Sequence, residues 1–398
     1  MKWTKWTCAL LFVVVALPSV VLGVGSAANR FQVVNRLRFE YDDNIYQEET
    51  DTDSSFKIIE EIEFLVNFSF TRTFVSVRYR PNYVWWQNRE PDHHDFNHDV
   101  DFVLNQNFSP RVTFSLTDTL RRGEIPESVD DNRIVREQDN FTYNAVNGTL
   151  GLLVMPQTKL EAAGRYLLLR YDNQDVADTE DFDLYVAGLT VRHQLVPETT
   201  LIGEMRGEEV SYEGPDRGSQ SYYVGGGVEQ TFSPNLLGSV RGGYQEKTFN
   251  DDNVGNESSP YVDLAVTFVP SPATRITANV GYSLFETDIY PYASQQRTLL
   301  AASLAHDLTA RISFYLSGGY TIGDYSADQS VEPGAVTDGS EDLIQVSTRV
   351  TYKLNRSNYL EAGWQYQDFS SDVSYVDGSG LRSSYERNRI DAGWKVEF

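Results

Sequence analysis

The chain is poor in cysteine and in basic residues. It has one cysteine among its 398 residues, and this residue, Cys8, lies in the first apolar stretch. The rest of the chain therefore has no disulfide bridge and no cysteine metal site. Lysine and arginine together number 33, against 57 aspartate and glutamate residues, so the net charge is -24. Such an acidic chain repels phosphate groups, which argues against nucleic acid as a partner.

After its first residues the chain also lacks any apolar run of the roughly 20 residues that a membrane-spanning helix needs. Its most apolar stretch, residues 8–22, follows two lysines and precedes the small residues 25–28. This order is typical of a cleaved secretory signal peptide, so we expect residues 1–28 to be removed. The cysteine lies inside the apolar stretch, which argues against a lipoprotein anchor. Residues 29–398 are expected to form the mature protein.

Aromatic residues are abundant, with 24 tyrosines and 21 phenylalanines. In the last segment, residues 389–398, even positions are apolar and odd positions are charged, with Gly393 the exception. A period of two places these two sets on opposite faces of one strand. Trp394, Val396 and Phe398 share one face. This ending resembles the closing strand of a bacterial outer-membrane β-barrel and the assembly signal that the barrel-assembly machinery reads. An ordinary edge strand that ends this way by chance is the alternative.

From Phe31 onward, extended alternating segments are separated by short and long connections strictly in turn. The short ones are rich in Pro, Asn and Ser, which form turns through fixed φ angles and local hydrogen bonds, while the long ones are acidic. Eight short and nine long connections predict 18 strands, with 16 as the alternative. A single-chain bacterial barrel requires such an even number. We therefore predict an all-β fold, a single-chain transmembrane antiparallel β-barrel with short periplasmic turns and long acidic extracellular loops.

The alternation also assigns a face to each charged residue of a strand. The face opposite the apolar one carries charges of both signs, and we predict that it lines the pore. The candidate pore-lining residues are Arg36, Arg38, Glu40, Glu61, Glu63, Arg78, Arg80, Asp99, Asp101, Glu204, Arg206, Arg389, Asp391 and Lys395. Opposed charges around a lumen can orient and select a polar solute. The alternative is that they pair across neighbouring strands and stiffen a hydrated wall.

The sequence also predicts where four tryptophans, one glutamate and one proline lie in the barrel. Four tryptophans are expected in the two aromatic girdles at the membrane interfaces. They are Trp85, Trp86, Trp364 and Trp394. Glu60 breaks an apolar face, and Pro81 lies within a strand segment although it cannot donate a ladder hydrogen bond. We expect a β-bulge, or a position near an interface or strand end, at each of these two residues.

The triplet Asp-Asp-Asn occurs three times in the long connections, at residues 42–44, 130–132 and 251–253. Clustered carboxylate and amide oxygens suit calcium or magnesium, including ions that bridge to lipopolysaccharide. Solvated acidic loops are the alternative, and the spacing fits no EF-hand loop. The sequence therefore leaves the question of bound metal open.

Three histidines cluster with three aspartates in the second long connection. They are His93, His94 and His98, with Asp92, Asp95 and Asp99. Histidine and carboxylate side chains together could bind a divalent metal or activate water, as in an outer-membrane hydrolase with a loop site. No motif places a serine or an acid beside them, so we expect no enzyme and no cofactor.

The first strand begins close to the expected cleavage site, so we expect no plug domain before it. This argues against energy-coupled uptake receptors and against protein-insertion barrels with periplasmic repeats. If the lumen is blocked, one of the longest connections, residues 123–139 or 326–341, must fold into it.

The segment 39–46, Phe-Glu-Tyr-Asp-Asp-Asn-Ile-Tyr, is similar to the start of the putative β-barrel porin 2 family, in which a strand ends in Tyr-Asp-Asp-Asn before an Asp-rich loop. The short Ser-Pro turns and the aromatic last residue extend the resemblance over the mature chain. The resemblance implies an outer-membrane barrel, and members often belong to exopolysaccharide synthesis and secretion systems. No catalytic residue is carried over.

Two classes of function follow. The first is a transport pore, either for polysaccharide passing to periplasmic export components and outward, or for passive entry of small hydrophilic solutes. The second is the outer-membrane hydrolase, with the barrel as its scaffold. In either case we expect outer-membrane lipid, lipopolysaccharide and the barrel-assembly machinery as partners.

Overall fold

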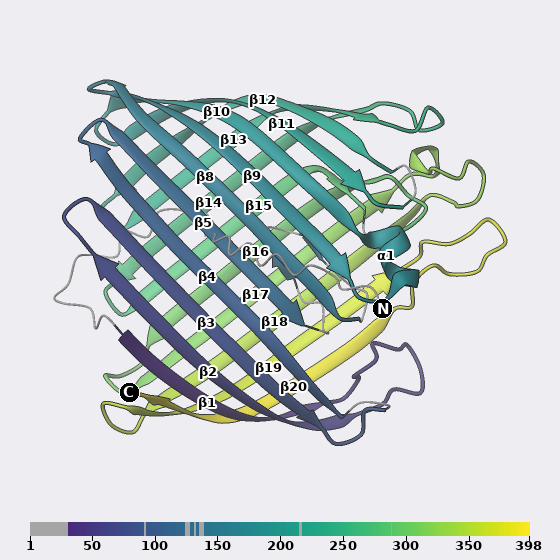
Figure 1. The fold of residues 1–398 in the computed structure, drawn as a ribbon, viewed down its shortest axis with the longest axis horizontal. Coiled ribbons are helices and arrows are strands. Elements are labelled where there is room, and N and C mark those ends of the chain that lie inside the picture. The colour runs from purple at the N-terminus through teal and green to yellow at the C-terminus, as the bar shows by residue number, and fades with distance from the viewer. Residues whose placement is uncertain are drawn as a thin grey trace, which may run out of the picture.

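The computed structural model describes residues 31–90, 93–123, 128–130, 133–134, 139–214, 217–287 and 289–398. Its strands form a closed barrel in which they run obliquely (Figure 1). The barrel strands are β1 (Phe31–Asp42), β2 (Ser55–Ser69), β3 (Thr73–Trp86), β4 (His94–Ser109), β5 (Val112–Gly123), β8 (Phe141–Met155), β9 (Thr158–Tyr171), β10 (Phe182–Val196), β11 (Thr199–Tyr212), β12 (Ser219–Ser233), β13 (Leu236–Phe249), β14 (Glu257–Ser271), β15 (Thr274–Glu286), β16 (Ser294–Asp307), β17 (Ile312–Tyr325), β18 (Gly339–Lys353), β19 (Asn358–Ser371) and β20 (Tyr385–Glu397). The expected signal peptide lies outside the described residues.

Every barrel strand is antiparallel to its neighbours, and the sheet closes because β1 pairs with β20 as well as with β2. We call this pairing of β1 with β20 the seam, and in it Leu37 lies opposite Trp394. The amide of Phe398 donates to the carbonyl of Val33 at 2.9 Å, so β1 starts where β20 ends. The predicted antiparallel barrel of 18 strands is confirmed.

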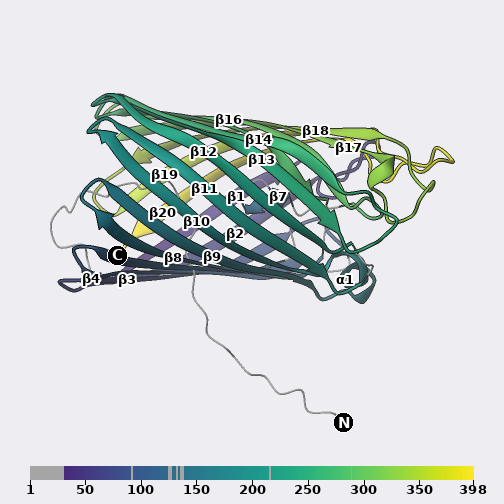
Figure 2. The same ribbon diagram turned by 90° about the horizontal axis from the view of Figure 1, so that it is seen from above.

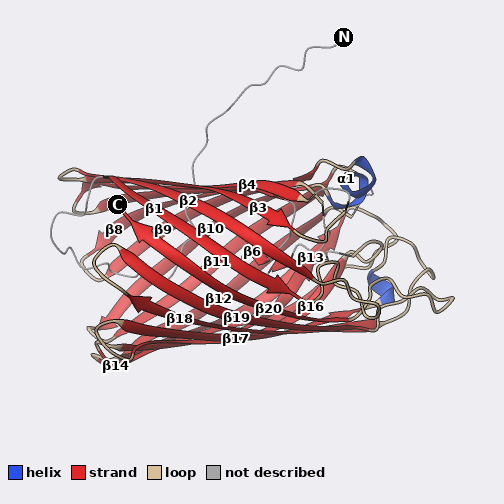
Figure 3. Ribbon diagram, turned by 90° about the horizontal axis from the view of Figure 1, so that it is seen from below, coloured by secondary structure: helices blue, strands red, loops and turns tan. Residues whose placement is uncertain are grey.

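Short and long connections alternate around the barrel as predicted (Figure 2). Turns such as residues 110–111 and 308–311 form one end, here called the turn end. Longer segments form the other, the loop end, which holds the short helices α1 (Gln174–Glu180) and η1 (Ala327–Gln329) (Figure 3). Within the described ranges, neither these nor any other helix is long and apolar enough to cross a bilayer.

Two short strands, β6 (Ser128–Asp130) and β7 (Arg133–Ile134), pair with each other in a separate small sheet. They belong to the possible plug segment 123–139, most of which lies outside the described residues. Its place in the lumen therefore stays a prediction.

The outer face of the wall is apolar and exposed. Phe64, Val350 and Trp394 expose 36%, 41% and 48% of their surface. Trp85 and Trp364 also point outward and are each 37% exposed. Side chains on this face of a transmembrane barrel meet lipid, with aromatic rings at the interfaces. Three of the four tryptophans therefore face the side on which girdles form.

The prediction that Trp86 lies in an interfacial girdle is wrong. Its side chain faces the inside of the barrel and is 1% exposed, and its indole N–H donates to Asp95 at 2.7 Å. The charged groups of Lys57 and Arg89 lie 4.2 and 4.7 Å from its ring centroid. Consecutive strand residues point to opposite faces, so if Trp85 faces out, Trp86 must face in. The inward ring is stabilised by cations, which the aromatic face attracts.

Neither Pro81 nor Glu60 marks a β-bulge, so that alternative is wrong at both residues, while a position of Glu60 near a membrane interface stays a prediction. β2 and β3 keep one register on both sides of Pro81. Its missing N–H interrupts the ladder locally without shifting it. Glu60 lies inside β2, where the side-chain amide of Asn35 donates to its carboxylate at 2.5 Å. A neighbouring amide therefore accommodates this acidic residue on the outer face.

Apolar clusters tie the long connections to the wall at the loop end. The largest joins inward residues of β8 to β11, among them Leu167, to Ala177 of α1. A second packs Tyr292 against Val336, so the other possible plug segment, residues 326–341, is held against a neighbouring loop. Burial of apolar surface stabilises such contacts by about 25 cal/mol per Å². The acidic loops are thus anchored by a minority of apolar residues.

On the inner wall, Tyr261 of β14 lies across two glycines, Gly225 of β12 and Gly243 of β13. Its hydroxyl donates to Glu204 at 2.9 Å. A Cβ at Gly243 would lie 2.7 Å from the Tyr261 ring and closer still to the carbonyl oxygen of Val224. The glycines therefore let the ring lie against the wall.

Gly243→Ala is expected to lower the free energy of unfolding by about 2 kcal/mol, because overpacking forces side chains and backbone apart. Gly203→Ala is the matched control, since nothing lies within 4 Å of its added Cβ. Urea unfolding of both variants in detergent, followed by tryptophan fluorescence, measures the difference. Equal stability of the two variants would contradict the packing of Tyr261 against Gly243.

Candidate pore and its charged lining

A first cluster of charges lies on the inner wall at the seam. The Nε atom of Arg36 lies 3.0 Å from Glu361, and the same guanidinium binds Glu61. Arg349 lies 3.1 Å from Asp391 and 3.7 Å from Glu361. These residues come from β1, β2, β18, β19 and β20, so the ion pairs run across neighbouring strands.

A second cluster lies on β3, β4 and β5. The Nε atom of Arg78 lies 2.9 Å from Asp101, and Arg80 lies 3.1 Å from Asp99. Arg121 lies 3.2 Å from Asp101 and 3.5 Å from Asp99. Three arginines thus share two carboxylates, which leaves this cluster with a net positive charge.

A third cluster lies across the barrel, on β11 to β13. Arg241 lies 3.5 Å from Glu229 and 3.6 Å from Glu204. The guanidinium of Arg206 lies 3.9 Å from the ring centroid of Tyr223, a cation–π distance. Each side of the inner wall therefore carries positive and negative side chains together.

Arg38 differs from these clustered charges. It lies opposite Gly393, and a Cβ at Gly393 would be 2.9 Å from its Cγ atom. The glycine that interrupts the alternation of the last strand therefore makes room for the arginine. The Nε atom of Arg38 is buried and has no hydrogen-bond partner among the described residues.

The remaining candidates share the inner face with these clusters. Register or ion pairing places on it Arg38, Glu40, Glu63, Arg389 and Lys395. Contact of any candidate with a solute stays a prediction. So does the assembly signal, although Trp394 and Phe398 are exposed on the outer face as that signal would require.

Several charges that complete the clusters are not among the candidate pore-lining residues. They are Arg121, Glu229, Arg241, Arg349 and Glu361. Each of them lies on the inner face of its own strand, as its charged partner does on a neighbouring strand. The alternation of apolar and polar residues, applied to every strand, would have found them.

The first Asp-Asp-Asn triplet closes the seam at the loop end. Asp42 is fully buried and lies 2.6 Å from both Arg387 and Lys57. Asp43 accepts a hydrogen bond from the backbone N–H of Asn388 at 2.6 Å. We call these five residues the seam clasp. Their carboxylate oxygens already accept from protein donors, which favours a structural role over metal binding.

The other two triplets differ in what the structure describes. Residues 131–132 lie outside the described residues, so metal binding by the triplet 130–132 stays a prediction. In 251–253, Asp251 accepts hydrogen bonds at 2.8 Å from the backbone and side-chain N–H groups of Asn253. Across the part of the chain that the structure covers, no group of three or more His, Cys, Asp or Glu side chains could hold a metal ion.

The described members of the histidine cluster lie on two faces of the wall, while Asp92 lies outside the described residues. His94 and His98 lie within β4 and face outward, where the Nδ1 of His98 is 2.8 Å from the Tyr79 hydroxyl. Asp95 and Asp99 face inward on the same strand. The barrel wall therefore separates these imidazoles from these carboxylates, and the expectation that all of them share one loop is wrong.

Two tyrosines, Tyr290 and Tyr292, connect the long loops. Burial raises the pKa of Tyr292 to about 12, so its hydroxyl stays protonated and donates to the carbonyl of Thr337 at 2.6 Å. Burial and a hydrogen bond to Glu332 raise the pKa of Tyr290 to about 12 as well. These loop contacts are therefore stable to pH over the neutral range.

Residues 27–398 match the family described as putative beta-barrel porin 2. The chain belongs to this family. Its fold is similar to that of OccK1 (OpdK) from Pseudomonas aeruginosa, with a TM-score of 0.50 and 11% identity over 92% of this chain and 99% of that one. It is also similar to OccAB2 from Acinetobacter baumannii, with a TM-score of 0.50 and 12% identity over 94% and 100% of the two chains. At these identities the likeness shows the fold alone.

A comparison with curated proteins gave no match. The resemblance carried by residues 39–46 is confirmed by the family match. The protein is thus an outer-membrane β-barrel porin. An extracellular loop end and a periplasmic turn end stay predictions.

Proposed function

We propose that the barrel is a passive pore for small hydrophilic solutes. The observation that carries this proposal is the inner wall, where charged side chains of both signs lie in ion-paired clusters on opposite sides. Barrels of 16 to 18 strands are wide enough to leave an aqueous channel. A wall of fixed charges keeps such a channel hydrated and favours small polar solutes.

This proposal takes the place of polysaccharide export, the first of the transport hypotheses. One structure similar in fold, OpdK with 11% identity and a TM-score of 0.50 over 92% of this chain and 99% of that one, was solved with vanillate. That protein accordingly holds a small molecule, which supports the passive pore over a polymer channel.

Refolded protein in a planar bilayer is expected to give stable, ohmic conductance steps. Liposomes that contain it are expected to swell in arabinose and glucose, and to swell progressively less in larger sugars, because passage through a pore depends on solute size. Protein-free liposomes and heat-unfolded protein are the controls. A correctly folded barrel that gives neither conductance nor swelling would refute the passive pore and return polysaccharide export to consideration.

A further inference from the structure

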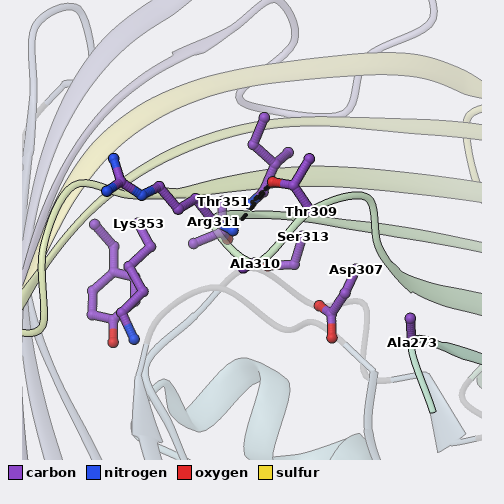
Figure 4. A pocket seen from close by; sticks show the side chains of 10 residues that line it. Ala273, Asp307, Thr309, Ala310, Arg311, Ser313, Thr351 and Lys353 are labelled. Atoms are coloured by element: carbon purple, nitrogen blue, oxygen red, sulfur yellow. Dashed lines mark hydrogen bonds between the residues drawn. The ribbon is translucent and has the colours of Figure 1, made fainter.

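A pocket of about 410 Å³ lies at the turn end of the lumen, on the wall formed by β16 to β19. It is lined by the turn residues Thr309–Arg311 and by inward side chains such as Asp307, Lys353 and Tyr359. Its volume falls within the range of about 300–1,000 Å³ that is typical of small-molecule sites. Figure 4 shows Arg311 and Lys353 on one side of the pocket and Asp307 toward the other.

The cations of this pocket differ from those of the ion-paired clusters. Arg311 is held through its backbone, which donates to Thr309 at 3.1 Å and accepts from the amide of Lys353 at 2.7 Å. The Nζ atom of Lys353 lies 5.6 Å from the ring centroid of Tyr359. Neither side chain has a carboxylate partner within the described segments, whereas Arg36, Arg78 and Arg349 all do.

The neighbouring strand β20 adds an ion pair and therefore no net charge. Lys395 lies 4.2 Å from the same tyrosine ring, on the side away from β18, and 3.0 Å from Glu397, to which Tyr359 donates at 3.2 Å. Asp307 is the acidic side chain among the residues that line the pocket. Two lining cations against one lining carboxylate leave the pocket with a net positive charge beside an aromatic face.

We infer that this pocket binds small organic acids that also carry hydroxyl groups. A carboxylate would bind Arg311 and Lys353, because charge-assisted hydrogen bonds to arginine and lysine are the strong ones in proteins. Asp307 would accept from a hydroxyl group of the same molecule, and the Tyr359 ring would contact its apolar face. The site lies at the turn end of the lumen, the expected periplasmic opening. It would therefore bind anions at the point where they pass from the pore into the periplasm.

Isothermal titration of the full-length, folded protein in detergent tests the inference with three related probes. Glucuronate is a hydroxylated carboxylate, glucose its neutral counterpart and glucosamine a cationic one. Glucuronate is expected to bind, and glucose and glucosamine to bind at least about tenfold more weakly, because they lack the charge that the two cations attract. Arg311→Ser together with Lys353→Gln is expected to weaken glucuronate binding by about tenfold.

Arg356→Ser is the matched control, because Arg356 lies in the neighbouring turn and does not line the pocket. Heat-dependent mobility in SDS gels verifies that each variant is folded. Equal affinity for glucuronate and glucose, or a double variant that binds like Arg356→Ser, would overturn the inference. Binding without bilayer conductance would support the pocket while refuting the passive pore, and conductance without binding would do the reverse.

Discussion

Asp42→Ala is expected to lower the free energy of unfolding by about 3–5 kcal/mol, because it leaves buried cations without their partner. Asp42 is 0% exposed, and its two oxygens lie 2.9 and 2.6 Å from the Nε and Nη2 atoms of Arg387. Lys57 lies 2.6 Å from Asp42 and would keep its ion pair with Glu40 at 2.8 Å in the variant. Arg387 would therefore lose more of its ion pairing than Lys57. An unpaired buried charge is far more costly than the pair itself is stabilising.

The seam clasp joins the first strand to the last, so its loss is expected to destabilise the whole barrel. β1 and β20 are the neighbouring strands that lie farthest apart in the sequence, so their pairing must overcome the chain entropy of closing the entire barrel. We expect Asp42→Ala to open the seam from the loop end.

Urea unfolding in lipid vesicles, followed by tryptophan fluorescence and by heat-dependent gel mobility, measures the effect. Glu49→Ala is the control, because Glu49 is an exposed carboxylate of the same loop. Asp42→Asn keeps the shape and removes the charge, so its stability should fall between the two. If Asp42→Ala unfolds at the same urea concentration as Glu49→Ala, the clasp does not hold the seam.

The barrel was predictable because its signals are local. Alternation of apolar and polar residues identifies a half-exposed strand from a few neighbours, and turn-forming residues such as those at 110–111 mark its ends. The opposite faces of Val350 and Arg349 follow from the same rule. Closure follows from the even number of strands and from termini that meet at one end. The fold and the face of each lining charge therefore needed no knowledge of distant contacts.

The predictions that were wrong concern residues whose contacts are distant in the sequence. Trp86 was misplaced because its inward ring is stabilised by Lys57 and Arg89, which no local pattern associates with it. Asp42 looked like a metal ligand because Arg387 lies at the other end of the chain. His98 looked catalytic because a cluster in sequence was read without the alternation that separates it from Asp99. Local rules assign faces, but only the closed barrel shows which residues meet.

Asp99→Asn together with Asp101→Asn is expected to shift the pore toward anions, with the ratio of potassium to chloride permeability falling about fivefold. The two carboxylates bind three arginines on the inner wall, at distances such as 3.1 Å for Arg80 and 3.2 Å for Arg121. Asparagine keeps the shape of aspartate, so the variant changes the fixed charge of the cluster by two units. A shift of one to two kT in the local potential changes ion occupancy by roughly three- to sevenfold.

The reversal potential across a bilayer with a salt gradient measures this ratio. The effect should be larger near 0.1 M salt than near 1 M, because the screening length falls from about 10 Å to about 3 Å. Asp328→Asn together with Asp377→Asn is the matched control, since both are exposed in long loops and the net charge changes equally. Equal shifts in the two double variants would place the arginine cluster away from the path of the ions. A shift confined to the lumen variant would make the cluster of β3 to β5 part of that path.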